Sequence, residues 1–242
     1  MDIFLQQLIN GLVLGSVYAL VALGYTMVYG ILELINFAHG EITMMGAMVA
    51  LSVIGALAPA APGLPGVLVL GAGLVVAIPV CVALGLLIER VAYRPLRHAP
   101  RLAPLITAIG VSIILQNVAM LIWGKQSLPF PAILPQGRHT LYGASITDVQ
   151  IAILLLATAI MLLLILMVQK TRLGRAMRAT AQSRQVASLM GVDVNRVIAA
   201  TFAIGSALAA VAGVMVSAYY GLAHYYMGFL LGLKAFSAAV LG

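Results

Sequence analysis

The side chains in this sequence that could do chemistry are few, and they sit within or beside long apolar stretches. Asn36, His39 and Glu41 cluster at a short polar interruption, and Gln116 and Asn117 lie midway along a later apolar stretch. If these stretches cross a membrane, polar side chains inside them are costly and often mark a transport pathway. We therefore treat the five residues as candidates for a translocation pathway. Two structural alternatives stay open: amides that bond neighbouring helices together, and a capped turn at His39 and Glu41.

Several enzymatic and metal-binding chemistries have no matching motif in the sequence. A phosphate-binding loop needs Gly-Lys followed by Ser or Thr, whereas the only lysine that follows a glycine, Lys125, precedes Gln126. No Gly-x-Ser-x-Gly turn, His-Glu-x-x-His helix or Cys-x-x-Cys pair occurs either. The four histidines fall in separate segments of the chain: His39, His98, His139 and His224. We therefore predict no enzyme activity, no cofactor and no metal site.

The composition indicates what kind of protein carries these residues. Of the 242 residues, 63% are hydrophobic and 8% are charged, whereas soluble domains are about 45–50% apolar and about 25% charged. A soluble fold of this length has too little interior to bury so many apolar side chains. The net charge of +7 does not indicate nucleic acid, because ten of the thirteen basic residues fall in two short clusters. The chain is therefore predicted to be an integral membrane protein without a nucleic-acid partner.

A membrane-spanning helix needs about 20 predominantly apolar residues, and six segments meet that length. They are roughly 8–30, 41–57, 67–89, 103–123, 149–168 and 197–217. The final stretch, 229–242, is too short to span as an ordinary helix and is predicted to be a partial or re-entrant seventh segment. The predicted fold is an all-α polytopic transmembrane bundle that forms a single domain over residues 1–242. We also expect the chain to be incomplete at its C-terminus, midway through a longer protein.

The basic residues predict how the spans are oriented in the bilayer. One cluster comprises Arg90, Arg94, Arg97 and Arg101, and the other comprises Lys170, Arg172, Arg175, Arg178, Arg184 and Arg196. Two predicted spans separate the clusters, so both lie on one face, which the positive-inside rule makes cytoplasmic. Counting the spans back from the clusters places the N-terminus outside.

The longest polar stretch follows the fifth predicted span, in a loop at about 169–196. Its sequence GRAMRATAQSRQVASLMGVDVNRV, residues 174–197, is predicted to be helical through Met190 and to end at Gly191. A short helix of mixed polarity on the cytoplasmic face could dock into a groove on a partner. The alternative is an interfacial helix whose arginines contact anionic lipid headgroups.

Small residues recur at every fourth position in two of the predicted spans. Gly205, Ala209 and Gly213 form such a ridge in the sixth span, and Gly11 and Gly15 begin one in the first. Ridges of this kind let helix backbones approach closely. We predict that these residues pack helices within the chain, with contact to a second membrane subunit as the alternative.

Four segments together resemble the permease subunits of branched-chain amino-acid ATP-binding-cassette importers. They are NFAHGE (36–41), ITAIGVSIILQN (106–117), GRAMRATAQSRQVASLMGVD (174–193) and GLKAFSAAVLG (232–242). The resemblance covers essentially the whole chain and is to the shorter of the two paired permeases. It implies a protein of the bacterial inner membrane that forms half of a translocation pathway. The partners that it implies are a second permease subunit, two cytoplasmic ATP-binding subunits, and a periplasmic binding protein that delivers leucine, isoleucine or valine.

By this resemblance, the loop at about 169–196 is similar to the coupling segment that seats on the ATPase, which favours docking over lipid contact. The residues assigned to coupling are Arg175, Arg178, Ala181, Gln182, Ala187, Gly191 and Asp193. Ser183 departs from the family pattern, in which many members carry an acidic residue, and Tyr225 stands where a proline is common.

Two rival functions stay open on the sequence. Related permeases share these motifs and carry urea, short amides or other small polar solutes, and the binding protein largely selects the substrate. An ion-coupled carrier or channel would need an ion-binding carboxylate within the bilayer. The acidic candidates Glu33, Glu41 and Glu89 all lie at span ends, which argues against such a carrier.

Overall fold

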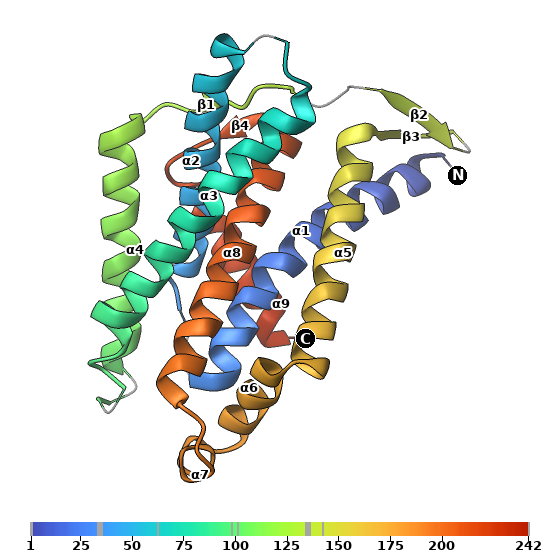
Figure 1. Cartoon of the computed structure of the whole chain (residues 1–242). Coiled ribbons are helices and arrows are strands. Elements are labelled where there is room, and N and C mark those ends of the chain that lie inside the picture. Colours follow the sequence, from blue (N-terminus) through green and yellow to red (C-terminus); the bar gives the residue numbers. More distant parts are fainter. Residues whose placement is uncertain are drawn as a thin grey trace.

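The computed structural model describes residues 2–32, 36–61, 63–97, 99–100, 102–133, 137–141 and 143–241, and within them the chain forms a helical bundle (Figure 1). In chain order the elements are α1 (Asp2–Leu32), α2 (His39–Ala60), α3 (Gly66–Ile88), the π-helical turn η1 (Glu89–Tyr93), α4 (Leu102–Trp123), β1 (Leu128–Pro129), β2 (Arg138–Leu141), β3 (Ala144–Thr147), α5 (Asp148–Lys170), α6 (Arg172–Gln182), α7 (Arg184–Leu189), α8 (Val194–Tyr220), β4 (Leu222–Ala223) and α9 (Met227–Leu241). Glu33, His98 and Arg101 lie outside the described residues.

Six of the described helices, α1 to α5 and α8, are long and apolar enough to cross a membrane. They confirm the predicted all-α polytopic bundle, and α9, with 15 residues, matches the predicted partial seventh segment. α1 begins earlier than predicted because its polar first turns have partners. Gln6 Nε2 donates to the Ser145 carbonyl at 2.9 Å, and Asn10 Oδ1 accepts from Gln150 Nε2 at 3.2 Å.

α8 is the central helix of the bundle and packs against α1, α2 and α3 (Figure 1). Every residue from 208 to 217 is buried. Small residues make this packing possible, because a Cβ added at Gly213 would overlap the carbonyl oxygen of Thr43 in α2. One turn away, a Cβ at Gly46 of α2 would lie 2.6 Å from Ala210 Cα. The α2 and α8 backbones therefore touch with no room for a larger side chain.

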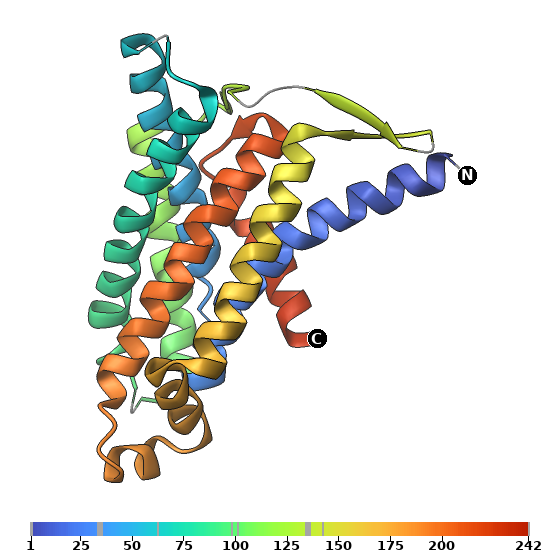
Figure 2. The same ribbon diagram turned by 45° about the vertical axis from the view of Figure 1, so that its right-hand side comes forward.

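The other small residues of the two predicted ridges behave differently. Ala209 is fully buried, and a Cβ at Gly205 would lie 3.5 Å from the Gly24 carbonyl oxygen of α1, an ordinary contact distance. At Gly11 and Gly15 a Cβ would meet no described atom within 4 Å. The described residues therefore show no close packing at Gly11 and Gly15, and contact with a second membrane subunit, the alternative, stays a prediction. In Figure 2 the N-terminal half of α1 leans outward from the centre of the bundle, and it contacts α5 and β3 with one face.

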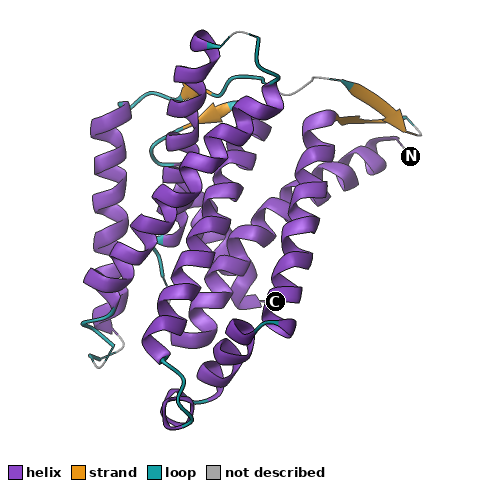
Figure 3. Ribbon diagram, in the orientation of Figure 1, coloured by secondary structure: helices purple, strands orange, loops and turns teal. Residues whose placement is uncertain are grey.

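The two ends of the bundle are built differently. The described strands all lie at one end (Figure 3), where β1 pairs with β4 and β2 pairs with β3 in antiparallel fashion. The N-terminus lies beside β2 and β3 at this end, and α6 and α7 lie at the opposite end (Figure 1). This arrangement keeps the loop predicted for docking well apart from the strands.

Candidate functional site

The loop between α5 and α8, residues 169–196 and called the docking segment below, forms two short helices rather than one. The chain is extended at Ser183, with φ −162° and ψ 114°, and α7 begins at Arg184. The Ser183 hydroxyl accepts a hydrogen bond from the Val186 amide at 3.3 Å, as a helix N-cap does. The predicted single helix through Met190 is therefore wrong, because the N-cap at Ser183 starts a new helix.

Local hydrogen bonds also fix the two ends of the docking segment. Thr171 Oγ1 accepts from the Gly174 amide at 3.0 Å where α6 begins, and Asp193 Oδ1 accepts from the Arg196 amide at 3.1 Å where α8 begins. Gly191 has a φ of +84°, a left-handed conformation that favours glycine. α7 itself ends at Leu189, so the helix stops one residue earlier than the predicted end at Met190.

The tip of the docking segment presents apolar side chains to its surroundings. Val186, Leu189 and Met190 are 57%, 86% and 80% exposed, and α7 lies at the far tip of the bundle (Figure 1). Ala187, in contrast, is buried against the rest of the chain. The remaining residues assigned to coupling are exposed: Arg175, Arg178, Ala181, Gln182, Gly191 and Asp193. Exposed apolar groups surrounded by polar ones are typical of an interaction surface. In the sequence, apolar residues within this polar stretch are the signal that predicts docking.

Two arginines of the docking segment donate to the ends of spanning helices. Arg178 Nη1 donates to the Val168 carbonyl near the end of α5. Arg184 donates through Nε to the Ile31 carbonyl at 3.1 Å and through Nη2 to the Leu32 carbonyl at 2.7 Å. Carbonyls in the last turn of a helix lack partners within the helix, so these contacts satisfy them. Sequence reasoning did not assign Arg184 to coupling, because its partners lie 153 and 152 residues away in the chain.

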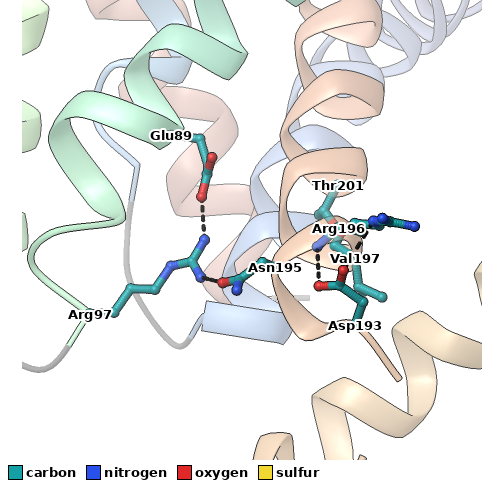
Figure 4. Close-up of polar contacts among 7 residues, drawn as sticks. All are labelled: Glu89, Arg97, Asp193, Asn195, Arg196, Val197 and Thr201. Carbon is teal, nitrogen blue, oxygen red and sulfur yellow. Dashed lines mark hydrogen bonds and ion pairs between the residues drawn. The ribbon is translucent and has the colours of Figure 1, made fainter. Parts of the chain in front are cut away.

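The first basic cluster meets the end of the docking segment, where α8 begins (Figure 4). Arg97 forms an ion pair with Glu89, and its Nη1 donates to Asn195 Oδ1 at 2.5 Å. Arg196 Nε pairs with Asp193 Oδ2 at 3.0 Å in the same view. Burial lowers the pKa of Arg97 below its usual value, and the Glu89 carboxylate opposes that shift. These contacts place the described arginines of both clusters at one end of the bundle.

The polar interruption before α2 is a turn enclosed by the bundle. Asn36 Oδ1 accepts from the Tyr93 hydroxyl at 3.0 Å and from the Ala38 amide at 3.1 Å. The His39 ring packs edge-on against Tyr25, with the ring centroids 4.7 Å apart. Asn36 and His39 are each 2% exposed. Hydrogen bonds within the turn and from Tyr93 thus hold it, and Asn36 and His39 are shielded from the surroundings of the chain.

Glu41, two residues after His39 in α2, binds two polar side chains of α4. Its Oε1 accepts from Gln116 Nε2 at 2.7 Å and from Ser112 Oγ at 3.0 Å. The Glu41 side chain is fully buried, and Oε2 has no described hydrogen-bond partner. Asn117 does not join this group, because it is exposed and donates to the Ile113 carbonyl of its own helix. Of the two predicted amides, the structure therefore brings only Gln116 to Glu41.

A cavity of about 180 Å³ adjoins this polar group. Ser112 and Gln116 form part of its wall, and Tyr25 and Phe229 contribute aromatic rings from α1 and α9. Glu41 is not among the residues that line the cavity, but it accepts hydrogen bonds from two side chains that do. Among the described residues, no three His, Cys, Asp or Glu side chains gather where they could hold a metal ion.

Comparison with known proteins gives a consistent match over nearly the whole chain. The family described as branched-chain amino acid transport system / permease component matches residues 7–242. The chain is 48% identical, over 243 residues, to the high-affinity branched-chain amino acid transport system permease protein LivH of Escherichia coli K12, covering 99% of this chain and 79% of that protein. It is also 48% identical, over 244 residues and with the same coverage, to the permease protein BraD of Pseudomonas aeruginosa PAO1.

A more distant relative comes from an archaeon. The chain is 29% identical over 219 residues to the probable branched-chain amino acid transport permease protein LivH of Methanocaldococcus jannaschii, covering 88% of this chain and 66% of that protein. No solved structure matches the chain. The match at residues 7–242 spans all six long apolar helices except the start of α1. The chain therefore belongs to the branched-chain amino acid transport permease family.

Proposed function

We propose that this chain is the membrane-embedded permease subunit of an ATP-binding-cassette importer for leucine, isoleucine and valine. The observation that carries the proposal is the 48% identity over 99% of the chain to permease proteins named for high-affinity branched-chain amino acid transport. The six long apolar helices are consistent with it. In this proposal the chain sits in a bacterial inner membrane and forms half of the translocation pathway.

The proposed machine needs partners, because nothing in the sequence provides a phosphate-binding loop. A second permease subunit would complete the pathway, two cytoplasmic ATP-binding subunits would hydrolyse ATP, and a periplasmic binding protein would deliver the substrate. A partner can shift a conformational equilibrium only if it contacts the two states differently. Closure of the ATP-binding subunits would provide that difference by moving the docking segment, which then tilts the spans and alternately exposes a cavity between the permeases.

The docking segment is the proposed contact with the ATP-binding subunits. Interfaces typically combine an apolar centre with a polar rim, and Leu189 and Met190 supply such a centre next to exposed Arg175 and Arg178. We favour docking over lipid contact because α7 lies at the tip of the bundle, beyond the ends of the spans (Figure 1). Its exposed side chains therefore lie outside the depth that the spans would place in the hydrocarbon of the bilayer.

The cavity beside α4 is proposed to be part of the pathway, and Ser112 and Gln116 are proposed to be its polar wall. Gln116 and Ser112 reach both the cavity and the Glu41 carboxylate. Asn36 and His39 would support this wall by fixing the turn from which α2 starts. The apolar side chain of the substrate would contact aromatic rings such as that of Phe229. The Gln116 amide and the Ser112 hydroxyl would contact the charged amino and carboxylate groups of the substrate.

The test is uptake of radiolabelled leucine by cells that lack their own leucine importers and express this chain with its neighbouring genes. We expect saturable uptake by the wild type. Gly191→Arg and Arg178→Glu should abolish uptake with the protein still inserted, because the first forces a bulky side chain into a left-handed backbone position and the second reverses a charge on the proposed interface. Lys125→Gln, exposed at the opposite end, serves as the control and should transport normally.

Two results would contradict the proposal. No leucine, isoleucine or valine uptake by the wild-type complex would refute the substrate class. Normal uptake by both docking-segment variants, with wild-type amounts of co-purified ATP-binding subunits, would refute the role of the docking segment.

A further inference from the structure

Arg184 differs from the other arginines of the docking segment in the element that its side chain reaches. Arg178 donates to the adjacent α5, whereas Arg184 crosses to α1. Arg172 and Arg175 are exposed, whereas Arg184 is half-buried. The extended conformation of Ser183 sets this direction, because it breaks the helical path of α6 immediately before Arg184. The guanidinium consequently turns back toward the bundle and reaches α1.

The contact that Arg184 makes is well suited to hold two elements together. Its planar guanidinium donates from two different nitrogens to two successive carbonyls, those of Ile31 and Leu32. A fork of this kind fixes orientation as well as distance, which the single ammonium of lysine cannot do. The C-terminal end of a helix also carries a partial negative charge that attracts a cation. Arg184 therefore joins the start of α7 to the last turn of α1.

The end of α1 leads directly to the turn that carries the polar residues. Only three residues separate Leu32 from Asn36 in the chain. Asn36 is itself held by Tyr93 and by the Ala38 amide, and α2 starts at His39 with Glu41 two residues later. The end of α1 and the first residue of this turn are therefore close neighbours in the chain.

We propose that Arg184 is a positioning residue that transmits movement of the docking segment to the turn formed by residues 36–41. This inference rests on the proposed function and adds a specific contact to it. When a partner shifts α7, the two hydrogen bonds of Arg184 draw the end of α1 along, and the turn before α2 follows. Without the guanidinium, the docking segment can move while α1 stays in place.

The first test measures coupling in the reconstituted complex of this chain with its partner subunits. Arg184→Gln should retain ATP hydrolysis, whereas leucine uptake should fall by about tenfold or more, since hydrogen bonds from a charged donor are lost. Arg184→Lys, which keeps the charge and loses the fork, should show an intermediate ratio of uptake to hydrolysis. Arg94→Gln is the matched control, because Arg94 is an exposed arginine at the same end but outside the docking segment.

The second test follows the movement itself and does not require any substrate. The single-cysteine variants Phe37→Cys, in the turn, and Ser188→Cys, on α7, are labelled with a maleimide in the nucleotide-free and ATP-bound complexes. Phe37 is half-buried and lines the cavity, and Ser188 is exposed. The native Cys81 is fully buried and can be replaced by alanine. In the wild type the labelling rate should change at both positions between the two states. In Arg184→Gln the change should persist at position 188 and disappear at position 37.

The outcomes separate this proposal from the proposed function. A wild-type complex without leucine uptake would refute the proposed function, whereas the labelling experiment would still decide the role of Arg184. Wild-type uptake by Arg184→Gln, or an unchanged labelling response at position 37, would overturn the proposal. Parallel loss of hydrolysis, uptake and partner binding would also overturn it, since Arg184 would then only support docking. If the glutamine variant fails to insert, the same comparisons are made with Arg184→Lys.

Discussion

Single residues decide how closely the spans pack, and Gly213 is the clearest case. A Cβ at this position would overlap the Thr43 carbonyl oxygen, which belongs to the backbone and cannot move aside cheaply. At Gly15, in contrast, a Cβ would meet no described atom within 4 Å. Two glycines with the same predicted role therefore have opposite tolerance to substitution.

This contrast leads to a prediction with a built-in control. Gly213→Ala should lower the free energy of unfolding by about 1–3 kcal/mol, because overpacking forces the α2 and α8 backbones apart. Gly15→Ala should leave stability unchanged or raise it slightly, since alanine is the better helix former. The measurement is the thermal unfolding midpoint of the purified protein in detergent. Equal midpoints for the two variants would show that α2 and α8 are not in backbone contact.

Buried polar residues also act locally, and Glu41 shows how. Its carboxylate is fully buried and accepts hydrogen bonds from both Gln116 and Ser112. Buried donors left without an acceptor are costly, so this carboxylate holds the two α4 side chains in fixed positions. The polar wall of the cavity is thus positioned by a residue that never touches the cavity.

At the scale of elements, the long helices could be predicted from the sequence because their signal is local. Apolar length alone identifies a span, and each of the six predicted segments lies wholly within one of the described long apolar helices. Other features depend on distant parts of the chain. The N-terminal extension of α1 depends on the hydrogen bond between Gln6 and Ser145. The hydrogen bonds of Arg184 depend on where α1 ends, because their acceptors are the last carbonyls of that helix. Neither contact leaves a pattern in the residues nearby.

The break between α6 and α7 lies between these two cases. A serine between two helical stretches is a favourable N-cap, so the signal at Ser183 was present in the sequence. It competes with a run of good helix formers on both sides, including Ala181 and Gln182, and the hydroxyl bond to Val186 decides the outcome. Gly11 and Gly15 show the opposite case: their spacing matches a packing ridge, but a Cβ at either position would meet no described atom within 4 Å.

The N-cap at Ser183 can be tested by substitution. Ser183→Ala should destabilise α7 locally by about 1 kcal/mol, because the cap for its first amides is lost. Amide hydrogen exchange in residues 184–189 should then become faster, and exchange in the centre of α8 should not change. Ser183→Asp should restore slow exchange, because aspartate caps as well as serine does. Slow exchange in the alanine variant would mean that tertiary contacts, rather than the cap, hold α7.

At the scale of the whole molecule, the two ends of the bundle differ in charge. The docking-segment end carries the described arginines of both clusters, including Arg94, Arg97, Arg175 and Arg178. The strand end carries Arg138 on β2 and Lys125 just after α4. Loops rich in arginine and lysine stay in the cytoplasm. This asymmetry predicts that the strands and the N-terminus face outward.

The orientation is tested with two exposed positions, one at each end of the bundle. Thr140 on β2 and Ser188 on α7 are both exposed, and the native Cys81 is buried and should not react. In intact spheroplasts, a membrane-impermeant maleimide should label Thr140→Cys at once, whereas Ser188→Cys should react only after the membrane is permeabilised. The opposite pattern would place the docking segment outside, where no ATP-binding subunit could reach it. That result would overturn both the topology and the coupling mechanism, because each requires α7 to face the cytoplasm.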